Sequence, residues 1–317
     1  MSVIVETAAA KINLALHVRT RRADGYHELE TLFAFLRDGD IVTVARVHDP
    51  VSRLAIPAEA GISNGAMDTR IAPSLGFRWT DEAGGAIAGE KVELAIIGPF
   101  AEGLAGHDNL VTRAAFAFRA AFAPGGRWNI TLDKRLPIAS GIGGGSADAA
   151  ATLRALARLE GVDLADPKLF AIADVLGSDV PACLFSRCAL GTGRGEQLTP
   201  VDGLSGIPVL LVNPGVGVST AAVFAGWGGT DLGGIAAGDP LAAAIAGRND
   251  LQPPALALAP IIAQLLDLLG AQPGVILSRM SGSGATCFAL FESRAAQATA
   301  ARAIASTGWW CLESVLA

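Results

Sequence analysis

The sequence predicts an α+β protein of two domains. Alternating segments rich in β-branched residues dominate the first third of the chain and return near its end, as in the strands of a mainly antiparallel sheet. Between them lie segments with apolar residues at helical spacing, each preceded by a residue type that commonly caps a helix. Helices packed on one side of an antiparallel sheet account for this order of elements.

The expected elements follow one another in two series. The first series has strands over residues 3–18, 40–47 and 128–133, and helices that begin at Asn109, Ser146 and Asp166. The second series starts with the strand "VLLVNPG" and continues with an apolar helix at 254–270, a strand, loop and strand at 275–291, a helix at 294–306 and a final strand at 308–316.

The restart of the pattern predicts a domain boundary near residue 201, which gives an N-terminal domain over 1–201 and a C-terminal domain over 202–317. A chain of 317 residues also exceeds the usual size of a single domain. From about residue 55 to residue 106 the chain carries Gly, Ala and acidic residues with weak periodicity. We interpret this region as a possible insertion or an extended loop region.

The composition excludes several classes of function. Hydrophobic residues make up 51% of the chain and charged residues 17%, as in a compact globular protein. The net charge of −6 and the lack of a basic tract argue against binding to nucleic acid or to an anionic membrane surface. No signal peptide is recognisable, and no apolar run reaches the roughly 20 residues of a membrane span. The four cysteines lack metal or redox spacing, so we expect free thiols and a cytoplasmic protein.

The stretch "RLPIASGIGGGSADAAATLRAL" places four glycines within residues 141–145, directly before an expected helix. Glycine adopts positive φ without penalty, and a helix N-terminus offers unsatisfied N–H donors with a partial positive charge. Together these features predict a phosphate-binding loop, although a mobile turn is the alternative. The loop matches neither the Walker A pattern nor the dinucleotide-binding pattern. Ser146 and Asp148 could face phosphate or Mg²⁺, or they could only cap the helix.

Three stretches resemble the GHMP kinase superfamily, the small-molecule kinases named for galactose, homoserine, mevalonate and phosphomevalonate. The glycine-rich stretch is similar to the phosphate loop of these enzymes, "AAAKINLALHVRTRRADGYHELETLF" to their first motif and "SRMSGSGATCFALF" to their third. The resemblance covers most of the chain outside residues 55–106. It implies the two-domain GHMP kinase fold, in which the N-terminal domain is like the second domain of ribosomal protein S5 and the C-terminal domain is ferredoxin-like.

Within the superfamily, "KINL" and "RRADGYHELETLF" resemble the branch that serves non-mevalonate isoprenoid synthesis. The resemblance implies phosphorylation by ATP of the 2-hydroxyl of 4-diphosphocytidyl-2-C-methyl-D-erythritol, which gives the 2-phosphate and ADP. Two residues depart from the phosphate loop expected of the family: Ile142 replaces Leu, and Ala147 replaces a second Ser. The first change is a mild change of packing, but the second removes a hydroxyl that could contact phosphate or metal.

Phosphoryl transfer to an alcohol often uses a carboxylate that accepts the hydroxyl proton. Asp179 in "LGSDVPACLF" matches the catalytic base of the family, although its residue type alone fits a helix cap equally well. Lys11 is costly to bury unless it meets a carboxylate or phosphate, and its alternative is a protective charge on an edge strand. In the family this Lys pairs with the Asp, so we expect Lys11 to contact Asp179 and to keep it ionised. Asn13 shares the strand face of Lys11 and is a candidate contact for the acceptor hydroxyls.

The only tyrosine, Tyr26, precedes His27, and such a pair can stack on a nucleobase and read its edge. A tyrosine that anchors a turn beside an exposed histidine is the alternative. The resemblance implies that Tyr26 and Phe224 sandwich the cytosine, that His27 reads it, and that Thr220 makes a polar contact with the substrate.

The resemblance also implies a set of contacts to ATP: Asn109, Lys134, Pro137, Ser140, Gly141, Gly143, Gly144, Gly145 and Ser146. From the residues alone, Asn109 is equally a helix cap and Lys134 a solvated charge. The "SGSGAT" loop at 281–286 is expected to approach the site from the second domain, or else to be a simple hairpin. Mg²⁺ is expected to accompany ATP, and no metal ligand is assigned.

Two other functions stay open at this point. One is a GHMP kinase that acts on homoserine or a mevalonate derivative, and the other is a catalytically silent nucleotide-binding module. The "GYH" stretch and Phe224 favour an acceptor that carries a base, and the presence of Lys11 and Asp179 favours an active enzyme. The expected partner is the small cytidyl-diphosphate substrate, and the expected protein is a monomer or a homodimer.

Overall fold

The computed structural model describes residues 2–47, 92–102, 104 and 109–317. The expected insertion over 55–106 therefore lies mostly outside the described residues. Its described end contains the strand β3 (Val92–Ile97), which pairs in parallel with β4 (Trp128–Asp133). The interpretation of the whole region as an insertion is therefore wrong for this end, because these residues form part of the main sheet.

The N-terminal half is built on a six-stranded sheet in the described part of the chain. Its order is β3-β4-β2-β5-β6, and β1 pairs with β2. The remaining strands are β1 (Val3–Arg21), β2 (His27–Arg46), β5 (Ala189–Gly193) and β6 (Gln197–Pro200). The three predicted strands are confirmed, but β2 begins earlier than the predicted residue 40. Its first half is buried on both faces, so it lacks the alternation that identifies a half-buried strand.

The N-terminal half also contains four helices within its described residues, which lie in the chain between β3 and β5: α1 (Leu110–Phe122), α2 (Gly144–Glu160), α3 (Pro167–Leu176) and α4 (Val180–Phe185). The side chains of Asn109 and Asp166 accept backbone N–H groups at the starts of α1 and α3, which confirms both predicted caps. Helix α2 begins at Gly144 rather than at the predicted Ser146. Its alanine-rich middle is buried, because small side chains let the helix lie close to the sheet and its neighbours.

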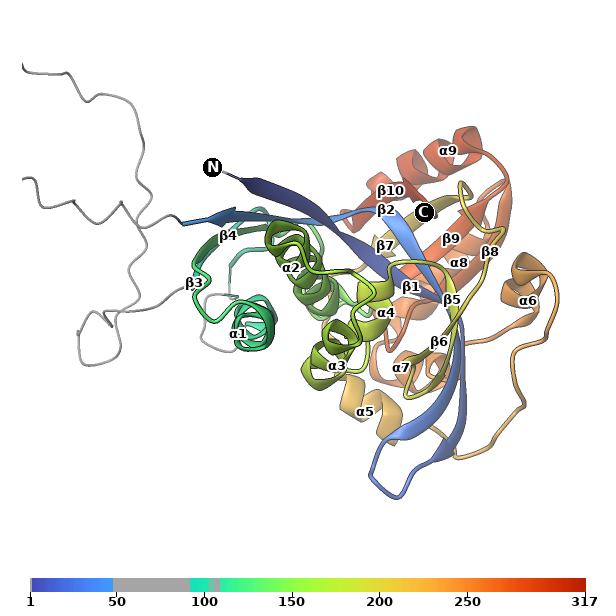
Figure 1. The fold of residues 1–317 in the computed structure, drawn as a ribbon. Coiled ribbons are helices and arrows are strands. Elements are labelled where there is room, and N and C mark those ends of the chain that lie inside the picture. The colour runs from blue at the N-terminus through green and yellow to red at the C-terminus, as the bar shows by residue number, and fades with distance from the viewer. Residues whose placement is uncertain (1, 48–91, 103, 105–108) are drawn as a thin grey trace, which may run out of the picture.

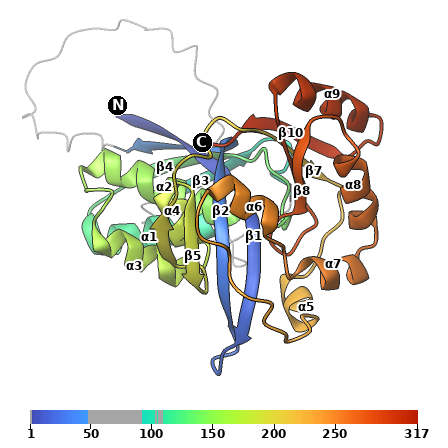
Figure 2. The same cartoon turned by 90° about the vertical axis from the view of Figure 1, so that its right-hand side faces the viewer.

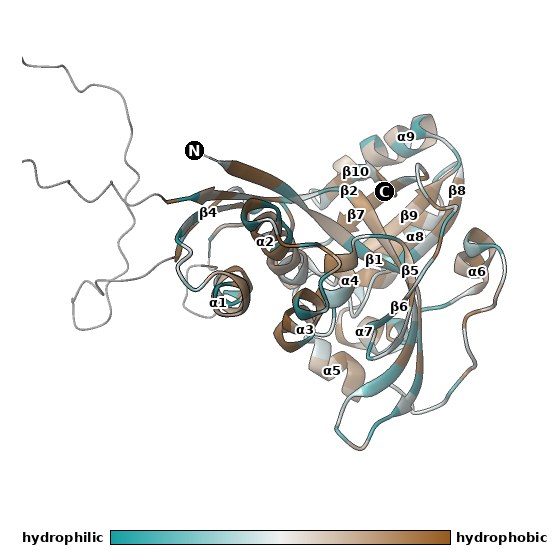
Figure 3. Ribbon diagram, in the orientation of Figure 1, coloured by the Kyte–Doolittle hydropathy of each residue, from teal (hydrophilic) through white to brown (hydrophobic). Residues whose placement is uncertain are grey.

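The C-terminal half contains a four-stranded antiparallel sheet with the order β10-β7-β9-β8. Its elements are β7 (Pro208–Asn213), α5 (Thr220–Ala225), α6 (Pro240–Ala246), α7 (Gln252–Leu258), α8 (Ile261–Gly270), β8 (Val275–Met280), β9 (Cys287–Phe291), α9 (Arg294–Ala305) and β10 (Trp310–Val315). Figure 3 shows hydrophobic residues along the central strands β7 and β9, which are buried.

One predicted helix of this half is wrong in extent. The expected helix over 254–270 is divided into α7 and α8, and the break falls at Ala259 and Pro260. Proline lacks an N–H donor and clashes with the preceding turn, so it interrupts the helix. The apolar pattern in the sequence nevertheless continues across the interruption. The predicted strands at 275–291, the helix at 294–306 and the final strand agree with β8, β9, α9 and β10.

The long β1–β2 hairpin joins the two halves. In Figure 1 it runs through the middle of the molecule, and Figure 2 shows α1 and α3 on one side of it and α8 and α9 on the other. Ile12 and Leu36 of the hairpin share a buried cluster with Leu211 and Phe288 of the C-terminal sheet. None of the described helices combines the length and hydrophobicity needed for a membrane span.

Candidate active site

Lys11 and Asp179 meet at the wall of a cavity of about 350 Å³. The Lys11 ammonium lies 3.0 Å from Oδ2 of Asp179 and 3.2 Å from Oδ1 of Asn13. Asp179 directly precedes α4, yet its side chain makes no capping hydrogen bond there, so its carboxylate is free to pair with the lysine. The expected contact between Lys11 and Asp179 is therefore present.

The orientation of Asn13 is fixed by its neighbours. Its Nδ2 donates to Oγ1 of Thr31 over 2.8 Å, and that hydroxyl in turn donates to the carbonyl of Ala15. This chain of donors leaves Oδ1 of Asn13 facing Lys11, on the shared strand face predicted from the sequence. The cavity is thus lined side by side by an ammonium, an amide and a carboxylate.

The glycine-rich loop presents the start of α2 to the same cavity. Gly143 has a φ of +67° and no side chain caps the helix there, so the first N–H groups of α2 remain available. A Cβ on Gly143 would lie 3.0 Å from Cε of Lys11, so this close approach to the lysine also favours glycine. An uncapped helix start beside a buried ammonium is a site for an anion such as phosphate.

The C-terminal half holds the other end of this loop. Oγ of Ser281 donates to the carbonyl of Gly141 over 3.0 Å, and the Thr286 N–H donates to the carbonyl of Ser140 over 3.1 Å. A Cβ on Gly141 would lie 2.6 Å from the carbonyl oxygens of Ser281 and Gly284, so the two backbones pack without room for a side chain. The 281–286 loop approaches the site from the second half of the chain, as expected.

Lys134, expected to contact ATP, does not line the cavity. Its ammonium is buried and lies 2.5 Å from Oδ2 of Asp40 and 2.7 Å from Oδ2 of Asp148. Burial alone would lower the pKa of Lys134, but the two carboxylates outweigh burial and raise it. The alternative of a solvated charge is wrong, because the Lys134 side chain is buried between the two carboxylates.

The two carboxylates beside Lys134 differ in their surroundings. Asp40 also accepts the backbone N–H groups of Arg135 and Leu136. Oδ1 of Asp148 is buried without a hydrogen-bond partner in the structure. Burial, together with the negative charge of Asp40, raises the pKa of Asp148 to about 7 against the pull of Lys134. Of the two carboxylates beside Lys134, Asp148 is therefore the one that can carry a proton.

Asn109 and Pro137 also lie outside the described lining of the cavity. Oδ1 of Asn109 accepts the Val111 N–H over 2.9 Å, which is the cap that its residue type alone suggested. The Pro137 carbonyl accepts a hydrogen bond of 2.7 Å from Oγ of Ser140 and braces the turn before the glycines. The remaining loop residues expected to contact ATP do line the cavity: Ser140, Gly141, Gly143, Gly144, Gly145 and Ser146.

Phe224 and His27 form an aromatic group next to the cavity. The His27 ring lies 4.9 Å from the ring of Phe224, and Phe224 and Thr220 line the cavity while His27 does not. Burial, followed by the charge of Arg21, lowers the pKa of His27, so the ring is neutral near pH 7. Tyr26 is 54% exposed at the tip of the β1–β2 hairpin, outside the described lining.

Several residues of this site escaped the sequence analysis. Trp227 packs edge-on against His27 at 5.6 Å, and its position one helical turn after Phe224 was a usable signal. Arg194 lines the cavity and its guanidinium lies 5.3 Å from the Tyr26 ring. Oγ of Ser283 lies 2.8 Å from Oγ1 of Thr220. Arg194 comes from a turn that no periodic pattern marks, whereas Ser283 belongs to the 281–286 loop that was expected to approach the site but was not singled out within it.

Comparisons with known proteins agree with this geometry. The family model described as "GHMP kinases N terminal domain" matches residues 109–187, and the one described as "GHMP kinases C terminal" matches residues 234–308. A 4-diphosphocytidyl-2-C-methyl-D-erythritol kinase of Rhizorhabdus wittichii is 49% identical over 98% of this chain and 94% of its own. One of Sphingopyxis alaskensis is 45% identical over 98% of both chains.

Solved structures of kinases are also similar to this chain. A crystal structure of 4-(cytidine 5'-diphospho)-2C-methyl-D-erythritol kinase superposes with a TM-score of 0.71 at 31% identity, and 99% of each chain is covered. The homoserine kinase of Cytophaga hutchinsonii superposes with a TM-score of 0.61 at 16% identity, over all of this chain and 95% of that one. The second likeness concerns the fold alone.

Proposed function

Since this chain belongs to the GHMP kinase superfamily and, within it, to the 4-diphosphocytidyl-2-C-methyl-D-erythritol kinases, we propose that it phosphorylates the 2-hydroxyl of 4-diphosphocytidyl-2-C-methyl-D-erythritol. Like the family, it is an ATP-dependent small-molecule kinase with an alcohol acceptor, and it serves non-mevalonate isoprenoid synthesis. The observation that carries the catalytic assignment is the contact between Lys11 and Asp179 beside the uncapped start of α2.

In the proposed reaction, Asp179 accepts the proton of the acceptor hydroxyl while the oxygen of that hydroxyl forms a bond to the γ-phosphorus of ATP. The bond from that phosphorus to the bridging oxygen breaks, and ADP leaves with the electron pair. The Lys11 ammonium offsets negative charge on the transferred group and holds Asp179 in place. Asn13, whose orientation is fixed by Thr31, positions the acceptor.

The N–H groups at the start of α2, with Ser140 and Ser146, are proposed to bind the phosphates of ATP. Asp179 is the only carboxylate among the described residues that line the cavity. Mg²⁺ is commonly held by substrate phosphates and water together with one or two protein oxygens. Because Asp179 serves as the base and pairs with Lys11, Mg²⁺ would be held chiefly by the phosphates and water, with the Ser146 hydroxyl as an available protein oxygen. When bound, the ion neutralises charge on the phosphates.

The aromatic group is proposed to bind the cytosine. Phe224 offers a flat surface at the cavity, and Tyr26 lies next in sequence to the His27 that packs on Phe224. The neutral His27 ring has one donor and one acceptor nitrogen, which suits the edge of a base. Thr220, linked to Ser283, supplies a further polar contact. Neither homoserine nor mevalonate carries a base, so this group favours the cytidyl acceptor.

Other parts of the proposal rest on the sequence together with the fold. We assign residues 1–201 to an N-terminal ATP-binding domain and residues 202–317 to a C-terminal domain, with the division between β6 and β7. Asn109, Lys134 and Pro137 are proposed to serve ATP indirectly, through the positions of α1, the loop and α2. Four free cysteines support a reducing compartment, such as the cytoplasm. A monomer or a homodimer is proposed.

A panel of acceptors tests the function. The purified protein is incubated with ATP and Mg²⁺ and, in parallel, with the cytidyl methylerythritol, homoserine and mevalonate acceptors, and ADP release is followed. Turnover with the cytidyl acceptor alone is expected, and it should be lost in Asp179→Asn. Turnover only with homoserine or mevalonate would overturn the substrate, and ADP release with none of the acceptors would favour a silent nucleotide-binding module.

A further inference from the structure

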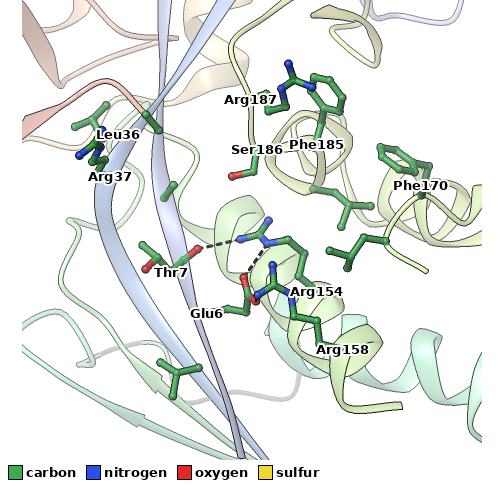
Figure 4. A pocket seen from close by; sticks show the side chains of 16 residues that line it. Glu6, Thr7, Leu36, Arg37, Arg154, Arg158, Phe170, Phe185, Ser186 and Arg187 are labelled. Atoms are coloured by element: carbon green, nitrogen blue, oxygen red, sulfur yellow. Dashed lines mark hydrogen bonds and ion pairs between the residues drawn. The ribbon is translucent and has the colours of Figure 1, made fainter. Parts of the chain in front are cut away.

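A second cavity, of about 1010 Å³, lies outside the active site. It opens between the first half of β1, the middle of β2, the second half of α2 and the end of α4 (Figure 4). No residue that lines it takes part in the proposed reaction. Its size reaches that of sites that bind small organic molecules, which occupy roughly 300–1,000 Å³.

Arginines dominate the charge of this cavity. Arg37, Arg154, Arg158 and Arg187 line it, whereas Glu6 is the only acidic side chain among the described lining residues. Such a concentration is unexpected in a chain whose net charge is −6. One acidic side chain cannot balance four guanidinium groups, so the side chains that line this cavity carry a net positive charge.

We call Arg154 and Arg158 the inner arginines because both pair with Glu6, although the Arg158 side chain is 53% exposed. Arg154 donates to Oε2 of Glu6 and to the carbonyls of Cys183 and Thr7, at 3.1, 2.7 and 2.9 Å. Arg158 lies 2.8 Å from Oε1 of Glu6. These contacts join β1, α2 and α4, and Figure 4 marks those of Arg154 with Thr7 and Glu6.

The two outer arginines have spare binding capacity. Arg37 is exposed and makes no ion pair within the described residues. Among the described residues, the one ion pair of Arg187 is with Asp202 at 3.4 Å, and the Asp202 side chain is itself 90% exposed. The Arg187 guanidinium lies over the ring of Phe185 at 5.7 Å, which orients its donors. Figure 4 shows Arg37 and Arg187 on opposite sides of the cavity.

The walls between these charges are apolar. Leu36, Leu164, Phe170, Leu184 and Phe185 line the cavity, and Phe170 and Phe185 are only partly buried. A fully hydrated inorganic ion would leave these aromatic faces in contact with water. An organic anion would cover them and would also meet the outer guanidinium groups.

We propose that this cavity is a second binding site, for a small organic anion whose phosphate or carboxylate is held by Arg187, with Arg37 attracting it from across the cavity, and whose apolar part lies against Phe170 and Phe185. The site is physically connected to the reaction centre. Asp179 directly precedes α4, whose other end forms a wall of the cavity. The carbonyl of Thr7 accepts a hydrogen bond from Arg154, and Thr7 precedes Lys11 within the same strand, β1.

Calorimetric titration with phenyl phosphate tests the proposal on the full chain, with the nucleotide site saturated by a non-hydrolysable ATP analogue. Binding is expected, and it should weaken about tenfold in Arg187→Gln, the loss typical of one charge-assisted contact, and by a smaller factor in Arg37→Gln, which removes only a longer-range attraction. Arg294→Gln makes the same change at the exposed start of α9, and should leave binding unchanged.

Further probes separate the two halves of the proposed ligand. Benzoate replaces the phosphate by a carboxylate, and the tighter of benzoate and phenyl phosphate identifies the preferred anion. Inorganic phosphate and benzyl alcohol, which carry only one half each, should bind at least tenfold more weakly than phenyl phosphate. Phenyl phosphate binding that is absent, or that is unchanged in the Arg37→Gln/Arg187→Gln double variant, would overturn the site. Equal affinity for inorganic phosphate would overturn its apolar half, and equal affinity for benzyl alcohol its anionic half.

Discussion

The ammonium of Lys11 lies 3.0 Å from the carboxylate of Asp179, yet the two side chains are exposed to very different degrees, 4% and 37%. The lysine is enclosed by β1, the glycine loop and the ring of Phe33, which lies 5.3 Å from its Nζ. The carboxylate reaches the cavity, where it can receive a proton from an acceptor. A fixed positive charge thus stands behind an accessible base.

Asp179→Asn tests this arrangement. Removal of a general base typically costs a hundred- to ten-thousand-fold in rate, so kcat should fall by about that factor while the KM for ATP changes by only a few-fold. Steady-state kinetics measure both values. Asp267→Asn on the exposed face of α8 is the matched control and should retain wild-type kcat. A kcat in Asp179→Asn within tenfold of wild type would remove Asp179 from the mechanism.

Gly143→Ala and Gly161→Ala form a matched pair at the two ends of α2. Both glycines have positive φ, +67° and +71°, but only a Cβ at Gly143 would approach Lys11, while Gly161 has open space. Both changes should destabilise the fold by about 1–2 kcal/mol through backbone strain. Only Gly143→Ala should also lower kcat/KM for ATP, by about tenfold or more. Thermal unfolding and kinetics separate the two effects, and equal kcat/KM values would contradict the close approach to Lys11.

Asp148→Asn should change how stability depends on pH. The folded state raises the pKa of Asp148 from 3.8 to about 7, so it keeps a proton that the unfolded chain releases. The stabilisation by that proton is complete below pH 3.8 and is lost as the pH rises through 7. Relative to the variant, the free energy of unfolding of the wild type should therefore fall by about 1.4 kcal/mol per pH unit until pH 7 and then level off.

Urea unfolding of both proteins at pH 5, 6, 7 and 8 measures this difference. Asparagine resembles the protonated carboxyl and can still accept from Lys134, so the variant is expected to fold. Parallel curves for the two proteins across this range would show that Asp148 is ionised throughout.

Tyr26→Ala tests the proposed cytosine contact. Loss of an aromatic ring that stacks on a base typically costs about 1–3 kcal/mol, so the KM for the cytidyl acceptor should rise by about tenfold or more. The KM for ATP should stay the same, because Tyr26 lies at the hairpin tip. Val175→Ala, at a side chain that is 81% exposed, is the control. An unchanged KM for the acceptor would leave Phe224 and His27 as the only aromatic contacts.

Much of the site was predictable because its residues lie in distinctive local patterns. Lys11 is a lone charge in an apolar strand, and the glycines precede a helix that begins without a side-chain cap. Asp179 matched a family motif, but only the structure shows that its side chain leaves the helix uncapped and pairs with Lys11. The break between α7 and α8 was also predictable, since Pro260 was visible within the apolar pattern.

The sequence by itself therefore determined the order of strands and helices, the anion-binding loop and the family, because each depends on residues that are neighbours along the chain or on a motif. Only the tertiary structure decided that Lys134 is buried between Asp40 and Asp148, and that four arginines meet around one cavity. Those groups come from elements far apart in the sequence. Electrostatic pairing and burial depend on distance in space, and packing fixes that distance only when the chain has folded.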